Sequence, residues 1–112
     1  AKILHNIGVC HRHNDDYDEA LECYNRAHTM FVEAAGRNHL DTVRTLHNIG
    51  GIYRRLEKYK KALLCFEEVL RVRRKILGED HTSVKITLVS IAAVLRRSGR
   101  VKEAYTFYAD AM

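Results

Sequence analysis

The feature that most constrains this chain is a repeat. The pentapeptide Leu-His-Asn-Ile-Gly occurs at 4–8 and again at 46–50, a separation of 42 residues. At the same separation, further identical residues follow at Arg12, Tyr17, Ala20, Leu21, Cys23, Gly36 and His39. A third, weaker copy stays in register, with Leu88, Ile91 and Ala92 in place of Leu46, Ile49 and Gly50. We therefore expect a little under three copies of one structural unit, each packing on its neighbours.

Each repeat carries two helical patterns. Apolar or small residues recur at the i, i+3, i+4, i+7 spacing of an amphipathic helix. In the second repeat these stripes are Leu46, Ile49, Gly50 and Tyr53, then Tyr59, Ala62, Leu63 and Phe66. We expect a helix A followed by a helix B in every repeat. The small residues Gly50 and Ala62 would let the two helices approach closely.

The residues between the stripes mark helix ends. Gly36 and Gly78 lie where a left-handed residue would end helix B, and Asn38 and Asp80 are then expected to cap the next helix A. The chain has no proline, so the turns between helices A and B are expected at the sequences HNDD, LEKY and SGRV. The predicted fold is all-α, with six antiparallel helices stacked as a solenoid.

Composition is consistent with one small domain. The chain has 112 residues, 46% apolar and 29% charged, ordinary values for a globular protein. It has no apolar run of the roughly 18–20 residues needed for a membrane span and no signal-peptide pattern. We therefore expect a soluble, cytoplasmic protein. The three cysteines lack C-x-x-C spacing, and reduced, mostly buried thiols are expected. A net charge of +5 favours acidic partners.

The pattern inside each repeat resembles the tetratricopeptide repeat. The residues that carry the resemblance are Leu46, Ile49, Gly50 and Tyr53 on helix A, with Ala62 and Phe66 on helix B. The 42-residue period, with Gly-x-x-His before helix A and TLHNIGGIY within it, resembles the repeat of kinesin light chains. The resemblance implies a right-handed α-solenoid of about three repeats, at roughly 1–36, 37–78 and 79–112 of a single domain 1–112. Because the sequence starts and stops within helices, we expect it to be part of a longer array.

The resemblance also implies where a partner binds. In tetratricopeptide arrays the A helices line a groove that holds an extended peptide, on the side opposite the packing stripe. The predicted peptide contacts are Lys2, His5, Asn6, Val9, Arg44, His47, Asn48, Gly51, Arg55, Ser90 and Arg97. This surface is basic and carries amides, groups that pair with carboxylates and with peptide backbone. The expected function is a protein-interaction scaffold or adaptor for an extended, acidic peptide.

Two pairs on this surface resemble part of the carboxylate clamp of chaperone-binding tetratricopeptide domains. They are Lys2 with Asn6 and Arg44 with Asn48. The third repeat has Ile86 and Ser90 at the corresponding positions, where the clamp would require further basic groups. An internal acidic segment is therefore favoured over a free C-terminus as the ligand.

No constellation predicts catalysis or a cofactor. The sequence Cys-His-Arg-His at 10–13 places neighbouring side chains about 100° apart around a helix, which favours packing over metal ligation. The acidic run at 14–19 lies at a helix start, where carboxylates cap amides. His39 and His81 recur at helix starts and are assigned to capping or inter-repeat contacts. We expect no enzymatic activity, no metal and no cofactor.

Two alternatives to peptide binding stay open at this point. The basic run at Arg71, Arg73, Arg74 and Lys75 permits RNA binding through phosphate contacts, although Glu67 at i, i+4 from Arg71 favours a salt-bridged, solvated face. The chain could also be a purely structural segment whose exposed ends associate with other copies. No membrane partner is expected.

Overall fold

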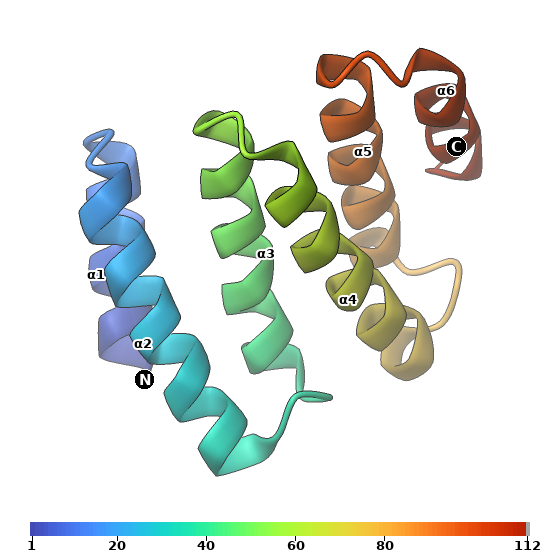
Figure 1. The fold of residues 1–112 in the computed structure, drawn as a ribbon. Helices are drawn as coiled ribbons and strands as arrows, with labels where there is room; N and C mark the ends of the chain where they lie inside the picture. The colour runs from blue at the N-terminus through green and yellow to red at the C-terminus, as the bar shows by residue number, and fades with distance from the viewer. Residues whose placement is uncertain (112) are drawn as a thin grey trace.

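The structure is a computed structural model that describes residues 1–111, and these form six helices in three antiparallel pairs (Figure 1). The helices are α1 Lys2–His13, α2 Tyr17–Ala35, α3 Leu40–Arg55, α4 Tyr59–Leu77, α5 Thr82–Arg97 and α6 Val101–Ala111. The A helices are α1, α3 and α5; the B helices are α2, α4 and α6. Each A helix packs on the B helix that follows it, and α2 and α4 also pack on the next A helix. The predicted stack of helix pairs is confirmed.

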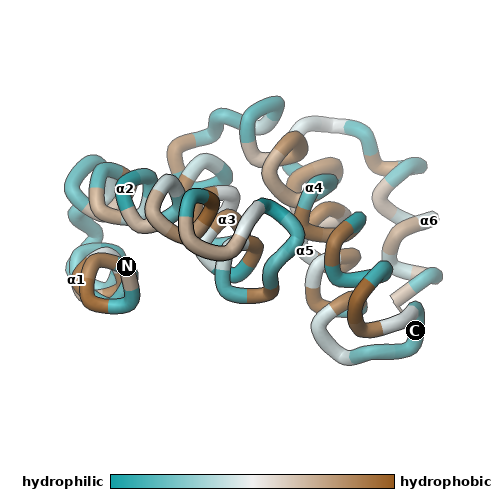
Figure 2. The backbone as a smooth tube through the Cα atoms, turned by 90° about the horizontal axis from the view of Figure 1, so that it is seen from below, coloured by the Kyte–Doolittle hydropathy of each residue, from teal (hydrophilic) through white to brown (hydrophobic). Residues whose placement is uncertain are grey.

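The core lies between the helices of a pair and between neighbouring pairs. One cluster joins Phe66 of α4 to Leu88 and Ile91 of α5, and another joins Tyr24 of α2 to Ile52 of α3. Figure 2 shows hydrophobic and hydrophilic stretches alternating along the helices, as the amphipathic pattern predicts. Within residues 1–111, no helix is long and apolar enough to cross a membrane.

Small residues bring the helices of a pair close together, as predicted. A Cβ atom added to Gly50 would lie 2.9 Å from a ring carbon of Phe66, and one added to Gly8 would lie 2.9 Å from Tyr24. Ala62 on the facing helix α4 is fully buried. Contacts this short leave no room for a methyl group without movement of the aromatic ring.

The helix starts correct the predicted caps. The N-caps of α3 and α5 are His39 and His81, one residue after the predicted Asn38 and Asp80. Each histidine accepts a hydrogen bond at Nδ1 from the backbone N–H two residues later, over 3.1 Å in α3 and 3.0 Å in α5. The capping role of these histidines is therefore confirmed. Asn38 instead accepts a hydrogen bond at Oδ1 from Arg71 Nη2, over 2.9 Å.

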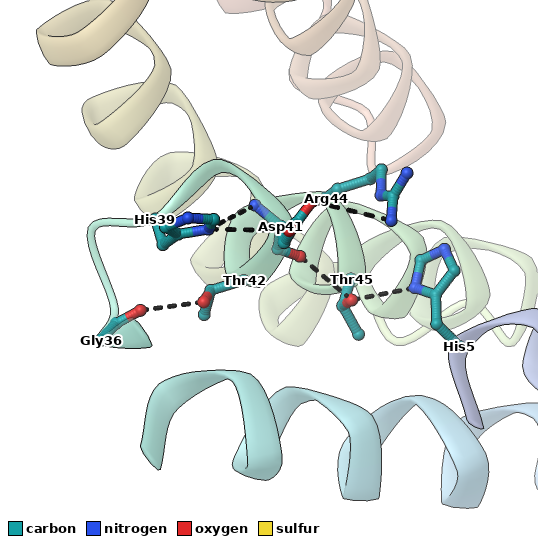
Figure 3. Close-up of polar contacts among 7 residues, drawn as sticks. All are labelled: His5, Gly36, His39, Asp41, Thr42, Arg44 and Thr45. Carbon is teal, nitrogen blue, oxygen red and sulfur yellow. Dashed lines mark hydrogen bonds and ion pairs between the residues drawn. The ribbon is translucent and has the colours of Figure 1, made fainter. Parts of the chain in front are cut away.

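The glycines that end the B helices have the expected positive φ with a different ψ. Gly36 has φ 86° and ψ 169°, and Gly78 has φ 88° and ψ 161°. This extended region with positive φ is essentially restricted to glycine and differs from the left-handed helical conformation that the sequence predicts. The Gly36 carbonyl oxygen also accepts a hydrogen bond from Thr42 Oγ1, over 2.8 Å (Figure 3). This bond ties the end of α2 to the start of α3.

Candidate functional site

Residues from all three A helices line one pocket of about 330 Å³. Its lining comprises Arg12, His13, Asp15, His47, Asn48, Gly51, Arg54, Arg55, Phe66 and Ser90. A second pocket of about 280 Å³ shares Arg54 and Arg55 with the first and adds Tyr17, Glu57 and Arg97. The two pockets therefore adjoin at the C-terminal end of α3. We call them together the arginine pocket.

Six of the predicted peptide contacts lie in the arginine pocket. These are His47, Asn48, Gly51, Arg55, Ser90 and Arg97. The other five lie elsewhere. Lys2 and Asn6 are exposed on α1 outside this pocket, and Val9 is half-buried against the core. Arg44 lines a different pocket and lies 3.8 Å from Asp41.

The structure places His5 inside the protein, where only 5% of its surface is exposed. Its Nδ1 lies 2.9 Å from Thr45 Oγ1 of the next repeat (Figure 3), and its ring makes an edge contact with Tyr24 at a centroid distance of 5.3 Å. Sequence geometry assigned it to the edge of the open surface because that geometry omits the neighbouring repeat. We therefore omit His5 from the proposed contact set.

His5 belongs to a chain of hydrogen bonds with one consistent direction. The Thr45 hydroxyl donates to the Asp41 carbonyl, over 3.2 Å, so its oxygen accepts from His5 Nδ1–H. His5 Nε2 is then the acceptor for the Asn48 amide, at 3.4 Å. Asn48 Oδ1 in turn accepts from Arg12 Nη1, over 3.2 Å. The chain holds the Arg12 side chain across the junction between α1 and α3.

This chain requires His5 to be neutral, and its surroundings favour that state. Burial lowers the pKa of His5, and the nearby positive charges of Arg44 and Arg12 lower it further. A protonated ring could not accept from Asn48. Asn48 is therefore engaged in an inter-repeat contact, although the sequence indicated an amide left free for a partner.

The equivalent junction between α3 and α5 lacks this chain. Ser90 replaces Asn48, and its hydroxyl donates to the Ile86 carbonyl, over 3.0 Å. Thr87, the counterpart of Thr45, accepts from Arg73 Nη1 over 2.8 Å. Arg54, the counterpart of Arg12, makes no side-chain hydrogen bond to the described residues 1–111. The second junction therefore leaves a partly buried guanidinium group without an acceptor.

His47, the counterpart of His5, loses its partner at the same junction. Its ring lies 5.2 Å from the Phe66 ring, between centroids, and its Nδ1 is a buried atom with no hydrogen-bond partner in the described part of the chain. Burial, followed by the positive charges of Arg73, Arg54 and Arg12, lowers the pKa of His47 to about 4. The ring is therefore neutral at physiological pH.

The arginine pocket holds cations that form no close ion pair with the described residues. Among residues 1–111, Arg12, Arg54, Arg55 and Arg97 form no ion pair within 4.0 Å, whereas Arg44, Arg71, Arg74 and Arg100 each do. The pocket also contains two acids. Asp15 accepts a hydrogen bond from Tyr17 Oη over 3.0 Å, and Glu57 lies at the second pocket. Burial lowers the pKa of Arg54, and repulsion from Arg55 and Arg97 lowers it further.

Sequence reasoning missed Arg12 and Arg54. They lie next to the packing stripe and outside the positions opposite to it, yet they are identical at the 42-residue separation. That identity, at a position outside the apolar stripe, was the available signal. Phe66 and Asp15 were missed because they come from a B helix and a turn, whereas the predicted surface included A helices alone.

The other constellations have structural surroundings. Within residues 1–111, no group of three or more His, Cys, Asp or Glu is placed to hold a metal ion. Cys10 is exposed, contrary to the expectation of mostly buried thiols, whereas Cys23 and Cys65 are half-buried. Burial raises the pKa of Cys65 to about 11, which disfavours the reactive thiolate.

The basic run on α4 is divided among different partners. Arg71 pairs with Glu68 rather than with the predicted Glu67, and Arg74 lies 3.0 Å from Glu79. Arg73 is half-buried and bonded to α5. These contacts favour a salt-bridged face over a free surface for RNA phosphates.

Comparison with known proteins gives the same architecture. The family model described as tetratricopeptide repeat matches residues 1–75 and 52–112. The structure of BtubC (BKLC) from P. vanneervenii matches with a TM-score of 0.94 and 18% identity, over 98% of this chain and 43% of that one. Kinesin light chain TPR-like repeats from Podosopora anserina match with a TM-score of 0.80 and 18% identity, over 96% and 51% of the two chains. A point-substituted variant of those repeats matches with a TM-score of 0.81. No curated protein sequence gives a significant match.

This chain spans about half the length of the solved structures it matches. At 18% identity the likeness establishes the fold alone, while the family model covers the whole chain. Repeats of this family generally mediate protein–protein interaction, and the fold is typically a non-enzymatic scaffold. The repeat period, the packed helix pairs and the family match agree, and the chain belongs to the tetratricopeptide repeat family.

Proposed function

We propose that this chain is an interaction scaffold that holds an extended, acidic peptide along α1, α3 and α5. The observation that carries the proposal is the arginine pocket, where Arg12, Arg54 and Arg55 lie together without an ion pair in the described residues. Guanidinium groups bind carboxylates through paired, charge-assisted hydrogen bonds. An acidic side chain would give these arginines the ion-pair partner that they lack among the described residues.

The exposed residues of the A helices extend this contact surface. Lys2 and Asn6 on α1 lie outside the pocket, and so does Arg44 on α3. They would contact parts of an extended peptide beyond its acidic anchor. Asn48 acts mainly by orienting Arg12, because both ends of its amide already have neighbours.

A purely structural role for the arginines has a physical basis as well. Arg12, Arg54 and Arg97 lie in the last turns of their helices, where cations complement the helix dipole by about 0.3–1 kcal/mol each. A dipole contribution needs charge only near the helix end, and it would not distinguish one peptide from another. A binding experiment therefore separates the two roles.

The test is an array of acidic and neutral peptides probed with the wild type and with Arg54→Glu/Arg55→Glu. The matched control is Lys60→Glu/Lys75→Glu, which makes the same charge change at exposed positions of α4 outside the arginine pocket. We expect the pocket variant to lose the acidic peptides and the control to keep them. If all three proteins retain the same peptides with equal affinity, the groove proposal is wrong.

We also propose that the ends of the stack associate with other copies. Ile3 is 75% exposed and Ile7 is 41% exposed, whereas their counterparts Thr45 and Ile49 are buried by the preceding repeat. At the other end, Tyr105 is 69% exposed. Sedimentation at rising concentration should show association of the wild type that weakens in Ile3→Lys. A strict monomer at high concentration would refute this.

A further inference from the structure

The arginine pocket lies where the repeat symmetry is broken. At the junction of α1 and α3, Asn48 accepts from Arg12 and completes the hydrogen-bond chain. At the junction of α3 and α5, Ser90 takes the place of Asn48 and turns its hydroxyl to the helix backbone. Arg54 therefore has donors available at the position where Arg12 has an acceptor. A ligand that replaces the missing acceptor would complete the second junction.

The charge of the pocket indicates what kind of acceptor fits. The arginine pocket contains Arg12, Arg54, Arg55 and Arg97 against the acids Asp15 and Glu57. These four arginines and two acids together leave an excess of two positive charges. A single carboxylate would neutralise one of them, whereas a phosphoryl group carries about −1.5 to −2 and three acceptor oxygens.

We propose that the arginine pocket binds the phosphoryl group of a phosphorylated serine or threonine in the partner peptide, with Arg54 as the central ligand. This inference rests on the proposed peptide-binding function and names the side chain that the pocket selects. Arg12 and Arg55 line the same pocket as Arg54, so one phosphoryl group can receive donors from α1 and α3. Guanidinium groups match phosphate geometry through paired N–H donors.

The structure also supplies the orientation that such a site needs. Arg12 is held by Asn48, and Asn48 is held by the buried His5. Because these contacts are made between residues of the chain itself, part of the ordering cost is met by folding. Asn48 is in this sense a positioning residue for Arg12.

The experiment compares a library of acidic peptides, each made with serine, glutamate or phosphoserine at one central position, by fluorescence anisotropy. We expect the phosphoserine form of the bound peptides to bind about tenfold more tightly than the glutamate form, because it adds charge-assisted hydrogen bonds. Arg54→Gln and the exposed Arg55→Gln should each reduce that ratio. Lys60→Gln on α4 should leave it unchanged. Inorganic phosphate should compete with the phosphoserine form more strongly than chloride at equal ionic strength.

The outcomes distinguish the phosphoryl site from the acidic-peptide groove on which it rests. If the glutamate and phosphoserine forms bind equally, the phosphoryl site is wrong and the acidic-peptide groove stands. If no form binds, both proposals fail. If vesicles that contain phosphoinositides bind through Arg54 and phosphopeptides do not, the site belongs to a membrane ligand and the present proposal is overturned.

Discussion

Two neighbouring glycines in α3 give a sharp test of how the helix pairs pack. A methyl group on Gly50 would lie 2.9 Å from a ring carbon of Phe66 and 3.1 Å from the Cys65 Cβ. A methyl group on Gly51 would meet no heavy atom within 4 Å. Phe66 is only 2% exposed, so its ring cannot move away into solvent.

The magnitude follows from two opposing effects. Alanine stabilises a helix interior over glycine by about 1 kcal/mol, and this gain applies to both positions. Overpacking costs about 1–3 kcal/mol, and it applies at Gly50 alone. We therefore expect Gly51→Ala to be more stable than the wild type, and Gly50→Ala to be less stable than Gly51→Ala by about 1–3 kcal/mol.

Urea unfolding followed by circular dichroism measures both variants against the wild type. The reasoning also predicts that Phe66→Leu, which shortens the opposing side chain, reduces the penalty of Gly50→Ala in a double-mutant cycle. If Gly50→Ala is as stable as Gly51→Ala, the close approach of α3 to α4 does not penalise a side chain at position 50. A penalty that persists in full with Phe66→Leu would locate the strain elsewhere.

Four further expectations concern single sites. The pKa of His47 is about 4 in the folded state and about 6.5 in the unfolded state. The neutral His47 ring therefore contributes to the free energy of unfolding above pH 6.5, and this contribution is lost as the pH falls toward 4. The loss is about 3 kcal/mol at most. The free energy of unfolding of His47→Phe, measured across the same pH range, should therefore fall less than that of the wild type. Labelling with a thiol reagent at pH 8 should modify the exposed Cys10 before Cys65; equal rates would contradict the burial of the latter. His39→Ala should lower the free energy of unfolding, measured in urea, by about 1 kcal/mol because the N-cap of α3 is lost. An unchanged value would show that the cap hydrogen bond does not contribute to stability. Ala62→Leu should cost about 1–3 kcal/mol by overpacking, and an unchanged thermal melt would oppose the assigned contact.

The repeat made the apolar half of this protein predictable. A stripe such as Leu46, Ile49 and Gly50 packs against a helix B in every copy, so its residues must be apolar or small each time. Helix existence, order and pairing therefore follow from spacing alone. The caps were displaced by one residue because histidine at position 39 can accept an amide hydrogen as asparagine does, and sequence preference alone favours Asn38.

The polar half was less predictable, because a polar side chain depends on residues that the periodicity does not determine. Asn6 and Asn48 occupy the same helix position, yet Asn6 is exposed and Asn48 is bonded to Arg12 of the preceding repeat. His5 and His47 also share a helix position, yet His5 has a hydrogen-bond partner in the next repeat and His47 Nδ1 has none among the described residues. His5 Nδ1 lies 2.9 Å from Thr45 Oγ1, whereas Thr87, the counterpart of Thr45, accepts a hydrogen bond from Arg73. Repeat symmetry thus predicts where a residue lies on its helix. Which residues it contacts depends on the side chains that the adjoining repeat places at that junction.

This difference between junctions bears directly on where a partner binds. At the first junction His5 and Asn48 are already hydrogen-bonded to protein partners, so a ligand that bound these two side chains would have to replace existing hydrogen bonds. At the second junction Arg54 has donors without an acceptor in the described residues, and the positive charges of Arg55 and Arg97 lie near it. An anion that binds there gains hydrogen bonds and neutralises repulsion together. The strongest binding position of a repeat protein can therefore be sought where its sequence departs from its own repeat, and in this chain that departure is Ser90 opposite Arg54.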